Sequence, residues 1–227
     1  MKLFLDTANI QEIGELIGTD AIAGVTTNPS LMAKESKGSY WEKAVQIADV
    51  IQFNSNYKKH LSVEAISTDP TQILKQSLQA HDLLSEAKYP NVEVFLKVPV
   101  TLDNLHVISE LASQGVNVNA TACMTVSQAK LASDAGARIV SFFYNRIRDG
   151  KGDPDQVLRE YRAMGEKIAM ADVICGSIRT PEDVMNAWKN GSHIVTASAK
   201  IIALMMKHEQ TDKAIEQFQK DIDSWLS

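Results

Sequence analysis

Short apolar runs recur along the chain, and a stretch with helical spacing of apolar residues follows each run. The runs cover residues 2–5, 22–25, 61–66, 92–98, 116–120, 138–143, 172–178 and 193–197. Most are apolar at consecutive rather than alternate positions, which is the pattern of a parallel strand buried on both faces. The chain therefore predicts a repeated strand–helix unit.

The expected helices carry start and stop signals in the sequence. N-cap residues followed by proline or by a capping-box partner mark several starts. Glycines mark two stops, where a left-handed residue is expected before the next strand. The starts are Asn9-x-x-Glu12, Asp69-Pro70, Thr125-x-x-Gln128 and Thr180-Pro181, and the stops are Gly136 and Gly191.

Eight strand–helix units in 227 residues fit a single (β/α)8 barrel domain spanning 1–227. A doubly wound open sheet is the alternative. That fold usually has a glycine-rich phosphate turn after its first strand, and Asp6-Thr7-Ala8-Asn9 is not such a turn. We therefore expect an α/β TIM barrel, followed by a C-terminal helix over about 211–226.

Charge and composition narrow the possible partners. A net charge of -5 gives no basic surface for nucleic acid. No apolar run approaches the length of a membrane span, and we find no signal peptide, so we expect a cytoplasmic protein. Two cysteines are too few for a disulfide framework, and the five histidines show no paired ligand spacing. We expect neither a metal nor another cofactor.

Polar residues gather where the expected strands end. In a barrel these carboxyl ends converge on one face, which carries the chemistry. Every run except the last offers a polar candidate there, and the last offers only the small hydroxyls of Thr196 and Ser198. The candidates are Asp6, Thr26, Thr27, Asn28, Glu64, Lys97, Asn119, Thr121, Ser141, Arg146, Ser177 and Arg179.

Lys97 is the most informative of these residues. It lies in Val94-Phe95-Leu96-Lys97-Val98-Pro99-Val100, an apolar strand without another charge. A lysine is rarely buried without a partner, and burial favours the neutral, nucleophilic amine. The alternative is a lysine whose ammonium reaches solvent. The polar ring around this central strand favours a lysine that attacks a carbonyl.

The other candidates have structural alternatives. Asp6 and Asn28 could cap the helices that follow them, and Asn28-Pro29 is a good cap pair. Ser177 and Arg179 could be ordinary loop residues before a helix. Glu64 is harder to explain structurally, because a carboxylate inside a strand needs a partner.

Four segments together resemble the transaldolase family, and its small-subunit branch with the fructose-6-phosphate aldolases most of all. The resemblance extends over nearly the whole chain. The segments are Leu5-Asp6-Thr7-Ala8-Asn9, Gly24-Val25-Thr26-Thr27-Asn28-Pro29-Ser30, Leu96-Lys97-Val98-Pro99-Val100 and Ser177-Ile178-Arg179.

The resemblance implies a role for each candidate. Lys97 would form a Schiff base with the C2 carbonyl of a ketose, and Asp6 would take the C4 hydroxyl proton as the C3–C4 bond breaks. Glu64, assisted by Thr121, would activate a catalytic water. Asn28 and Asn119 would bind the dihydroxyacetone unit. Arg146, Ser177 and Arg179 would bind the terminal anion, and Thr26, Ser141 and Phe143 would line the substrate pocket.

Three positions separate the two branches of the family. Transaldolases resemble this chain in Glu64, Ser141 and Phe143, whereas the aldolases have Gln, Ala and Tyr there. A phenylalanine cannot protonate and release free dihydroxyacetone. The resemblance therefore implies a transaldolase of the pentose phosphate pathway that transfers a dihydroxyacetone unit between sugar phosphates. A lyase releasing dihydroxyacetone is the first alternative, and an inactive phosphosugar-binding barrel is a remote one.

The chain departs from the family pattern near the expected anion site. Ser141-Phe142-Phe143-Tyr144-Asn145-Arg146 replaces Ser-Pro-Phe-x-Gly-Arg, and Arg148 stands where an acidic residue is common. Thr196-Ala197-Ser198 replaces a usual Met-Pro. A ketose with a terminal sulfonate, such as 6-deoxy-6-sulfofructose, is therefore an alternative substrate.

The C-terminal helix has one apolar stripe, formed by Ile215, Phe218, Ile222, Trp225 and Leu226. The stripe could pack on the barrel of its own chain. In the small-subunit branch this helix crosses to a neighbouring subunit, and the resemblance implies a homo-oligomer built as a pentamer-based decamer.

Overall fold

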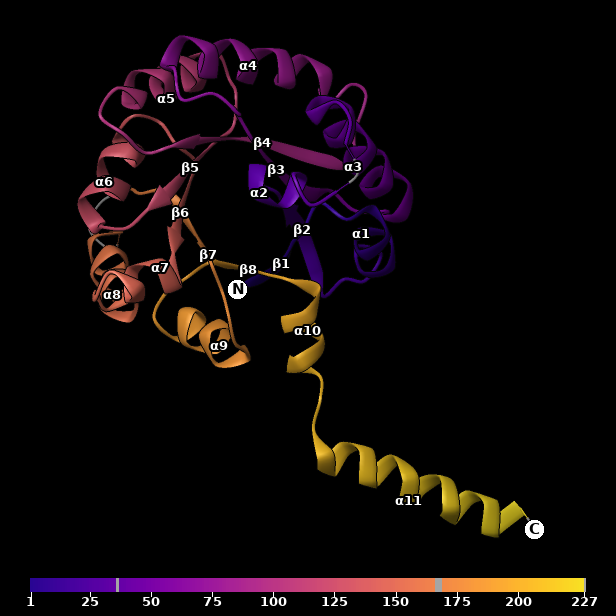
Figure 1. Ribbon diagram of the computed structural model, residues 1–227. Coiled ribbons are helices and arrows are strands. Elements are labelled where there is room, and N and C mark those ends of the chain that lie inside the picture. The colour runs from indigo at the N-terminus through magenta and orange to yellow at the C-terminus, as the bar shows by residue number, and fades with distance from the viewer. Residues whose placement is uncertain (36, 166–168, 227) are drawn as a thin grey trace.

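Eight parallel strands close into a barrel in the computed structural model, which describes residues 1–35, 37–165 and 169–226. Each strand pairs with its neighbours in chain order, and β8 closes the ring against β1 (Figure 1). The predicted (β/α)8 barrel is confirmed. The strands are β1 (Lys2–Asp6), β2 (Ile22–Thr26), β3 (Lys59–Glu64), β4 (Val92–Pro99), β5 (Val118–Cys123), β6 (Ile139–Phe143), β7 (Asp172–Gly176) and β8 (Ile194–Ala197).

Helices follow the strands and surround the barrel. The predicted caps form, because Asn9, Asp69, Thr125 and Thr180 each accept a hydrogen bond from the first turn of the helix they precede. The described helices are α1 (Ile10–Leu16), α2 (Pro29–Met32), α3 (Tyr40–Asn54), α4 (Pro70–Leu83), α5 (Asn104–Ser113), α6 (Val126–Asp134), α7 (Tyr144–Asp149), α8 (Pro154–Gly165), α9 (Pro181–Lys189), α10 (Ala199–Met205) and α11 (Glu209–Leu226).

Strands β3, β5 and β7 differ from the expected runs by two or more residues at one end or both, and two of these differences have identifiable reasons. The third strand was expected at 61–66 but begins at Lys59, whose buried ammonium donates to the carbonyls of Thr19 and Ile22 at 3.1 and 2.8 Å. The fifth was expected to end at residue 120 but continues to Cys123. Its pairing with β6 shifts register beside Ala122, which has a φ of 60°. This bulge resets the direction of the strand end.

The interior of the barrel has two layers that follow from the strand period of two residues. An apolar layer contains Phe4, Phe95, Ile139, Ile174 and Ile194, all buried in one cluster. Two residues further along β1, β4 and β8, the same inward face carries Asp6, Lys97 and Thr196. The packed apolar layer therefore forms a floor beneath a polar layer at the carboxyl ends of the strands.

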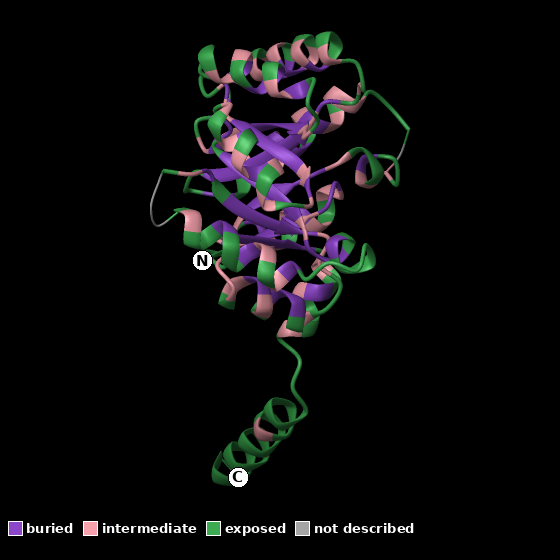
Figure 2. Ribbon diagram, turned by 90° about the vertical axis from the view of Figure 1, so that its left-hand side faces the viewer, coloured by how far each residue is buried: buried purple, intermediate pink, exposed green. Residues whose placement is uncertain are grey.

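The main hydrophobic cores lie between the outside of the barrel and the helices. Residues such as Ile13, Ile47, Leu61, Ile108 and Val140 are fully inaccessible to solvent. Burying each aliphatic side chain of this size stabilises the fold by about 1.5–3 kcal/mol. Figure 2 shows this arrangement as a buried barrel inside helices whose outer faces are exposed.

α11 is the exception to this packing. It projects away from the barrel after a short connection, and its residues are exposed along its length (Figures 1 and 2). Phe218 and Trp225 are 69% and 79% exposed, so the apolar stripe does not pack on its own barrel. The helix begins two residues before the predicted start at 211. None of the helices in the described ranges is both long and apolar enough to cross a lipid bilayer.

Candidate active site

A cavity of about 460 Å³ opens at the carboxyl ends of the strands. Of the twelve residues to which the resemblance assigns a role, eleven line this cavity, and Arg179 does not. The strand-end candidate Thr27 does not line it either, and its hydroxyl donates to the carbonyl of Ser62 at 3.1 Å. A larger hollow of about 690 Å³ lies between α2 and α3, but the predicted catalytic residues do not line it. The lining residues from the prediction are Asp6, Thr26, Asn28, Glu64, Lys97, Asn119, Thr121, Ser141, Phe143, Arg146 and Ser177.

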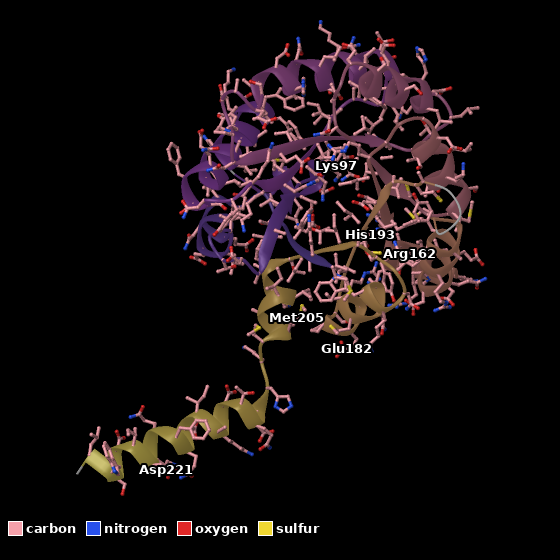
Figure 3. The ribbon with its side chains drawn as sticks, turned by 180° about the vertical axis from the view of Figure 1, so that it is seen from behind. Lys97, Arg162, Glu182, His193, Met205 and Asp221 are labelled. Atoms are coloured by element: carbon pink, nitrogen blue, oxygen red, sulfur yellow. The ribbon has the colours of Figure 1, made fainter. Side chains whose placement is uncertain are left out.

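Lys97 lies at the inner end of this cavity. It is 5% exposed, and Figure 3 shows it within the ring of strands. The register of β3 against β4 pairs Glu64 with Lys97, and Lys97 Nζ lies 2.9 Å from Glu64 Oε2. Nζ also donates to the carbonyl of Thr27 at 2.7 Å. A carboxylate thus stands where it can accept a proton from the ammonium, so the alternative of a solvent-reaching lysine is wrong.

Asp6 sits at the end of a short chain of hydroxyl groups. Thr26 Oγ1 donates to Asp6 Oδ1 at 2.7 Å, and the two hydroxyls of Thr26 and Thr196 are 2.6 Å apart. Because Thr26 gives its proton to Asp6, Thr196 is the donor to Thr26. Burial raises the pKa of Asp6, although the ammonium of Lys97 and the Thr26 hydrogen bond lower it. A carboxyl with a raised pKa suits proton transfer at near-neutral pH.

Asn28 both caps a helix and lines the cavity. Its side-chain oxygen accepts from the Leu31 amide at 2.9 Å and caps α2, while the residue lines the cavity. Asp6, in contrast, does not cap α1, because Asn9 holds that position. The capping alternative is therefore confirmed for Asn28 and wrong for Asp6.

Asn119 and Ser141 are joined across neighbouring strands β5 and β6. Ser141 Oγ donates to Asn119 Oδ1 at 2.7 Å, and Asn119 Nδ2 donates to Ser62 Oγ at 3.0 Å. All three side chains are buried. These bonds fix the amide plane of Asn119 at the cavity wall.

Thr121 and Ser177 are held by unusual backbone at the strand ends. Thr121 precedes the bulge residue Ala122, and Ser177 itself has a φ of 58°. Positive φ is costly for residues with a Cβ and concentrates at functional sites. Thr121 Oγ1 is buried without a hydrogen-bond partner among the described residues, and Thr121 lines the cavity.

The expected anion-binding residues separate into two groups. Arg146 and Ser177 line the cavity, whereas Arg179 forms a two-fold ion pair with Asp149, with one bond of 2.8 Å. The hydrogen bond from Arg179 lowers the pKa of the Asp149 carboxyl. Arg148 binds Asp183 at 3.0 Å. Arg146 is therefore the arginine that faces the cavity.

Three further residues at the site were not among the predicted ones. Ser62 and Thr196 bond to predicted residues, and Lys34 lines the cavity after α2. The period of two gives the missing signal for Ser62, which precedes Glu64 by two positions on the same face of β3. Thr196 was noted as a small hydroxyl, and its partner Thr26 could not be identified without the strand register. Within the described ranges, no three His, Cys, Asp or Glu side chains gather as metal ligands.

Comparison with known proteins places this geometry in one family. The sequence profile of the family "Transaldolase/Fructose-6-phosphate aldolase" matches residues 3–226. The chain is 34% identical to a "Probable transaldolase" of Symbiobacterium thermophilum, with 97% of this chain and 96% of the relative covered. It is 36% identical to proteins of the same description from Dehalococcoides mccartyi, with 97% of each chain covered, and Halalkalibacterium halodurans, with 97% and 98% covered. The chain belongs to the transaldolase/fructose-6-phosphate aldolase family.

Proposed function

We propose that this protein is a transaldolase that carries a dihydroxyacetone unit as a Schiff base on Lys97. The observation that carries the proposal is the buried Lys97 ammonium, 2.9 Å from Glu64 in the cavity that Asp6 also lines. Glu64 accepts the ammonium proton, directly or through a water, and frees the amine. The amine attacks the C2 carbonyl of the donor ketose, and water leaves as the imine forms.

Asp6 acts as the base for carbon–carbon cleavage. Its carboxylate takes the proton of the C4 hydroxyl, the C3–C4 electron pair moves into the imine, and an aldehyde leaves. The enamine that stays on Lys97 then attacks the carbonyl of an acceptor aldehyde, and Asp6 returns the proton to the new hydroxyl. Its raised pKa supports both directions of this transfer, because the two protonation states lie closer in free energy.

The remaining residues of the cavity bind the sugar. Asn28 and Asn119 hold the dihydroxyacetone unit, and the unpaired hydroxyl of Thr121 holds a water beside Glu64. Arg146 and Ser177 bind the terminal anion, since an arginine fork matches phosphate oxygens. Arg179 contributes from the edge of this site, oriented by Asp149.

Phe143 favours transfer over simple lysis. It lines the cavity and has no hydroxyl with which to protonate the enamine. The adjacent Tyr144 cannot replace it, because this side chain is buried in the core and its hydroxyl donates to Asp155 at 2.5 Å. The enamine therefore persists until an acceptor aldehyde arrives.

Borohydride trapping tests the proposal. The protein is incubated with fructose 6-phosphate and reduced, and the adduct is mapped by peptide mass spectrometry. We expect a dihydroxyacetone-sized adduct on Lys97 that erythrose 4-phosphate discharges when it is added before reduction. Discharge without an acceptor would identify a lyase instead. An adduct with 6-deoxy-6-sulfofructose alone would assign the terminal anion as sulfonate, and no adduct with either ketose would refute the mechanism.

The exposed stripe of α11 supports a homo-oligomer. Ile215, Phe218, Ile222, Trp225 and Leu226 are between 43% and 79% exposed on a helix that its own barrel does not cover. We propose that the stripe packs against a second copy, in a pentamer-based decamer in the cytoplasm. Light scattering after size exclusion should give the mass of a decamer. Replacing Phe218 and Trp225 with serine should reduce the measured mass of the assembly. A monomer for the unaltered protein would refute this assembly.

A further inference from the structure

His60 is a buried titratable residue that the proposed reaction does not use. It lies on β3, is 6% exposed, and belongs to the floor of the barrel. Its ring is stacked on Phe95, with centroids 4.4 Å apart, and tilted against Phe4 at 4.7 Å. Gly24 on β2 makes room for it, since a Cβ on Gly24 would lie 2.6 Å from His60 Cβ. The floor is therefore built around this imidazole.

The imidazole is connected to the active site by hydrogen bonds. His60 Nε2 lies 2.6 Å from Ser62 Oγ, which accepts from Asn119 Nδ2 at 3.0 Å. Ser141 Oγ donates to Asn119 Oδ1 at 2.7 Å. Asn119 and Ser141 line the cavity, so a continuous chain runs from the cavity wall to the floor.

The protons in this chain can be assigned a direction. Ser141 donates to Asn119, and Asn119 donates to Ser62. The single proton of Ser62 can then go to His60 Nε2, 2.6 Å away, an arrangement that has the ring proton on Nδ1. Burial lowers the pKa of His60 to about 3, and the charges of Lys2 and Arg138 add to the effect. The ring is therefore neutral, so one of its two nitrogens carries a proton and the other is an acceptor.

We propose that His60 is a positioning residue that ends a one-way chain from Ser141 through Asn119 and Ser62, and so fixes which atoms Asn119 and Ser141 present to the sugar. A ring with its proton on Nε2 would donate to Ser62 and reverse the direction of these hydrogen bonds. The Asn119 amide would then flip, and Ser141 would become an acceptor. The tautomer of His60 thus sets the donor and acceptor pattern of the cavity wall. The effect on catalysis rests on the proposed function, whereas the tautomer does not.

The tautomer is measured on the ligand-free protein by nitrogen-15 NMR of the histidine rings. We expect His60 to show an unprotonated Nε2 and a protonated Nδ1, and the Asn119 side-chain amide to shift in Ser62→Ala. A His60 ring with its proton on Nε2 would overturn the proposal. This readout needs no substrate, so it decides the question even when no ketose forms an adduct on Lys97.

The effect on turnover is measured with His60→Phe, which keeps a ring between Phe4 and Phe95. We expect kcat/KM for fructose 6-phosphate to fall roughly tenfold, mainly through KM, as for a buried polar group left unpaired. In a Ser62→Ala background the series of hydrogen bonds is already broken, so His60→Phe should cause no further loss of kcat/KM. Equal losses in both backgrounds would mean that His60 only packs, and would overturn the proposal. His106→Phe, at an exposed position, is the control and should change neither constant.

Discussion

Lys59 and Lys97 are two lysines on neighbouring strands, each 5% exposed, and they occupy opposite ends of the barrel. Lys59 begins β3, and its ammonium donates to two backbone carbonyls, those of Thr19 and Ile22. Lys97 lies near the end of β4, beside the Glu64 carboxylate and in the wall of a cavity. Burial is equal, but the surroundings differ.

The comparison shows which property marks a nucleophile. The Lys59 ammonium donates to the carbonyls of Thr19 and Ile22, so it ties the segment at the start of β2 to the start of β3. Lys97 also donates to one carbonyl, that of Thr27, but in addition it lies beside the Glu64 carboxylate and lines a cavity that can admit a ligand. Burial of a lysine therefore does not identify a catalytic amine. The nearby carboxylate and the cavity are the two features that support the proposed role of Lys97.

Replacing Lys97 gives the largest expected effect. Lys97→Met should lower kcat/KM by more than about 10⁴-fold, because the residue that bonds to the substrate is gone. Borohydride trapping should then give no adduct anywhere in the chain, Lys59 included. An adduct on Lys59, or turnover close to that of the unaltered protein, would contradict the distinction between the two lysines.

Replacing Asp6 separates activity from stability. Asp6→Asn should lower kcat by about 10²–10⁴-fold, the range for a lost general base. Burial raises the pKa of Asp6 in the folded state, so its contribution to stability is present below the unfolded pKa and is lost as the pH rises through the folded pKa. Asp6→Asn should therefore raise Tm at neutral pH, and this gain should shrink toward acid pH.

The matched control for this variant is Asp20→Asn, at an exposed position. It should change neither the turnover nor the pH dependence of Tm. A lower Tm for Asp6→Asn at neutral pH would show that attraction to Lys97 outweighs the cost of burying the carboxylate.

The barrel was predictable because strand burial on both faces and helix caps are local signals. The candidate site residues could be predicted for the same reason, because they lie at strand ends. All of them except Thr27 and Arg179 line a single cavity. The sequence did not reveal partners that depend on register. Thr196 on β8 bonds to Thr26 on β2, with β1 between these two strands, and Arg179 turns to Asp149 on α7. Such pairs are set by the three-dimensional arrangement, which a strand pattern does not contain.

Lys59 itself illustrates the same limit. Polar residues at 59 and 60 hid the start of β3, because a strand buried on both faces is expected to be apolar. The carbonyls that satisfy Lys59 belong to the segment around β2 and could not be assigned from the sequence. His60 was missed in the same way, since its partner Ser62 becomes visible only when the inward face of β3 is known.

Replacing Lys59 should affect stability and leave catalysis unchanged. Lys59→Met keeps the aliphatic part of the side chain but removes the donor to two carbonyls. We expect the free energy of unfolding to fall by about 2 kcal/mol, the cost of losing hydrogen bonds to a charged donor. Urea denaturation measures this, with exposed Lys75→Met as a control that should have no effect. A fall in kcat/KM with unchanged stability would reverse the roles that we assign to the two lysines.

The smallest effect is expected at Thr196, which is connected to the proposed base Asp6 through two hydrogen bonds. Thr196→Val keeps the shape of the side chain but removes the hydroxyl that donates to Thr26, which in turn donates to Asp6. We expect kcat to fall about fivefold, as for one neutral hydrogen bond. Because Thr26 becomes a weaker donor, the Asp6 carboxylate loses stabilisation, and the acid limb of the kcat profile should move to higher pH. Thr211→Val on exposed α11 should leave the profile in place, and an unmoved acid limb in Thr196→Val would show that Thr26 holds Asp6 without help from β8.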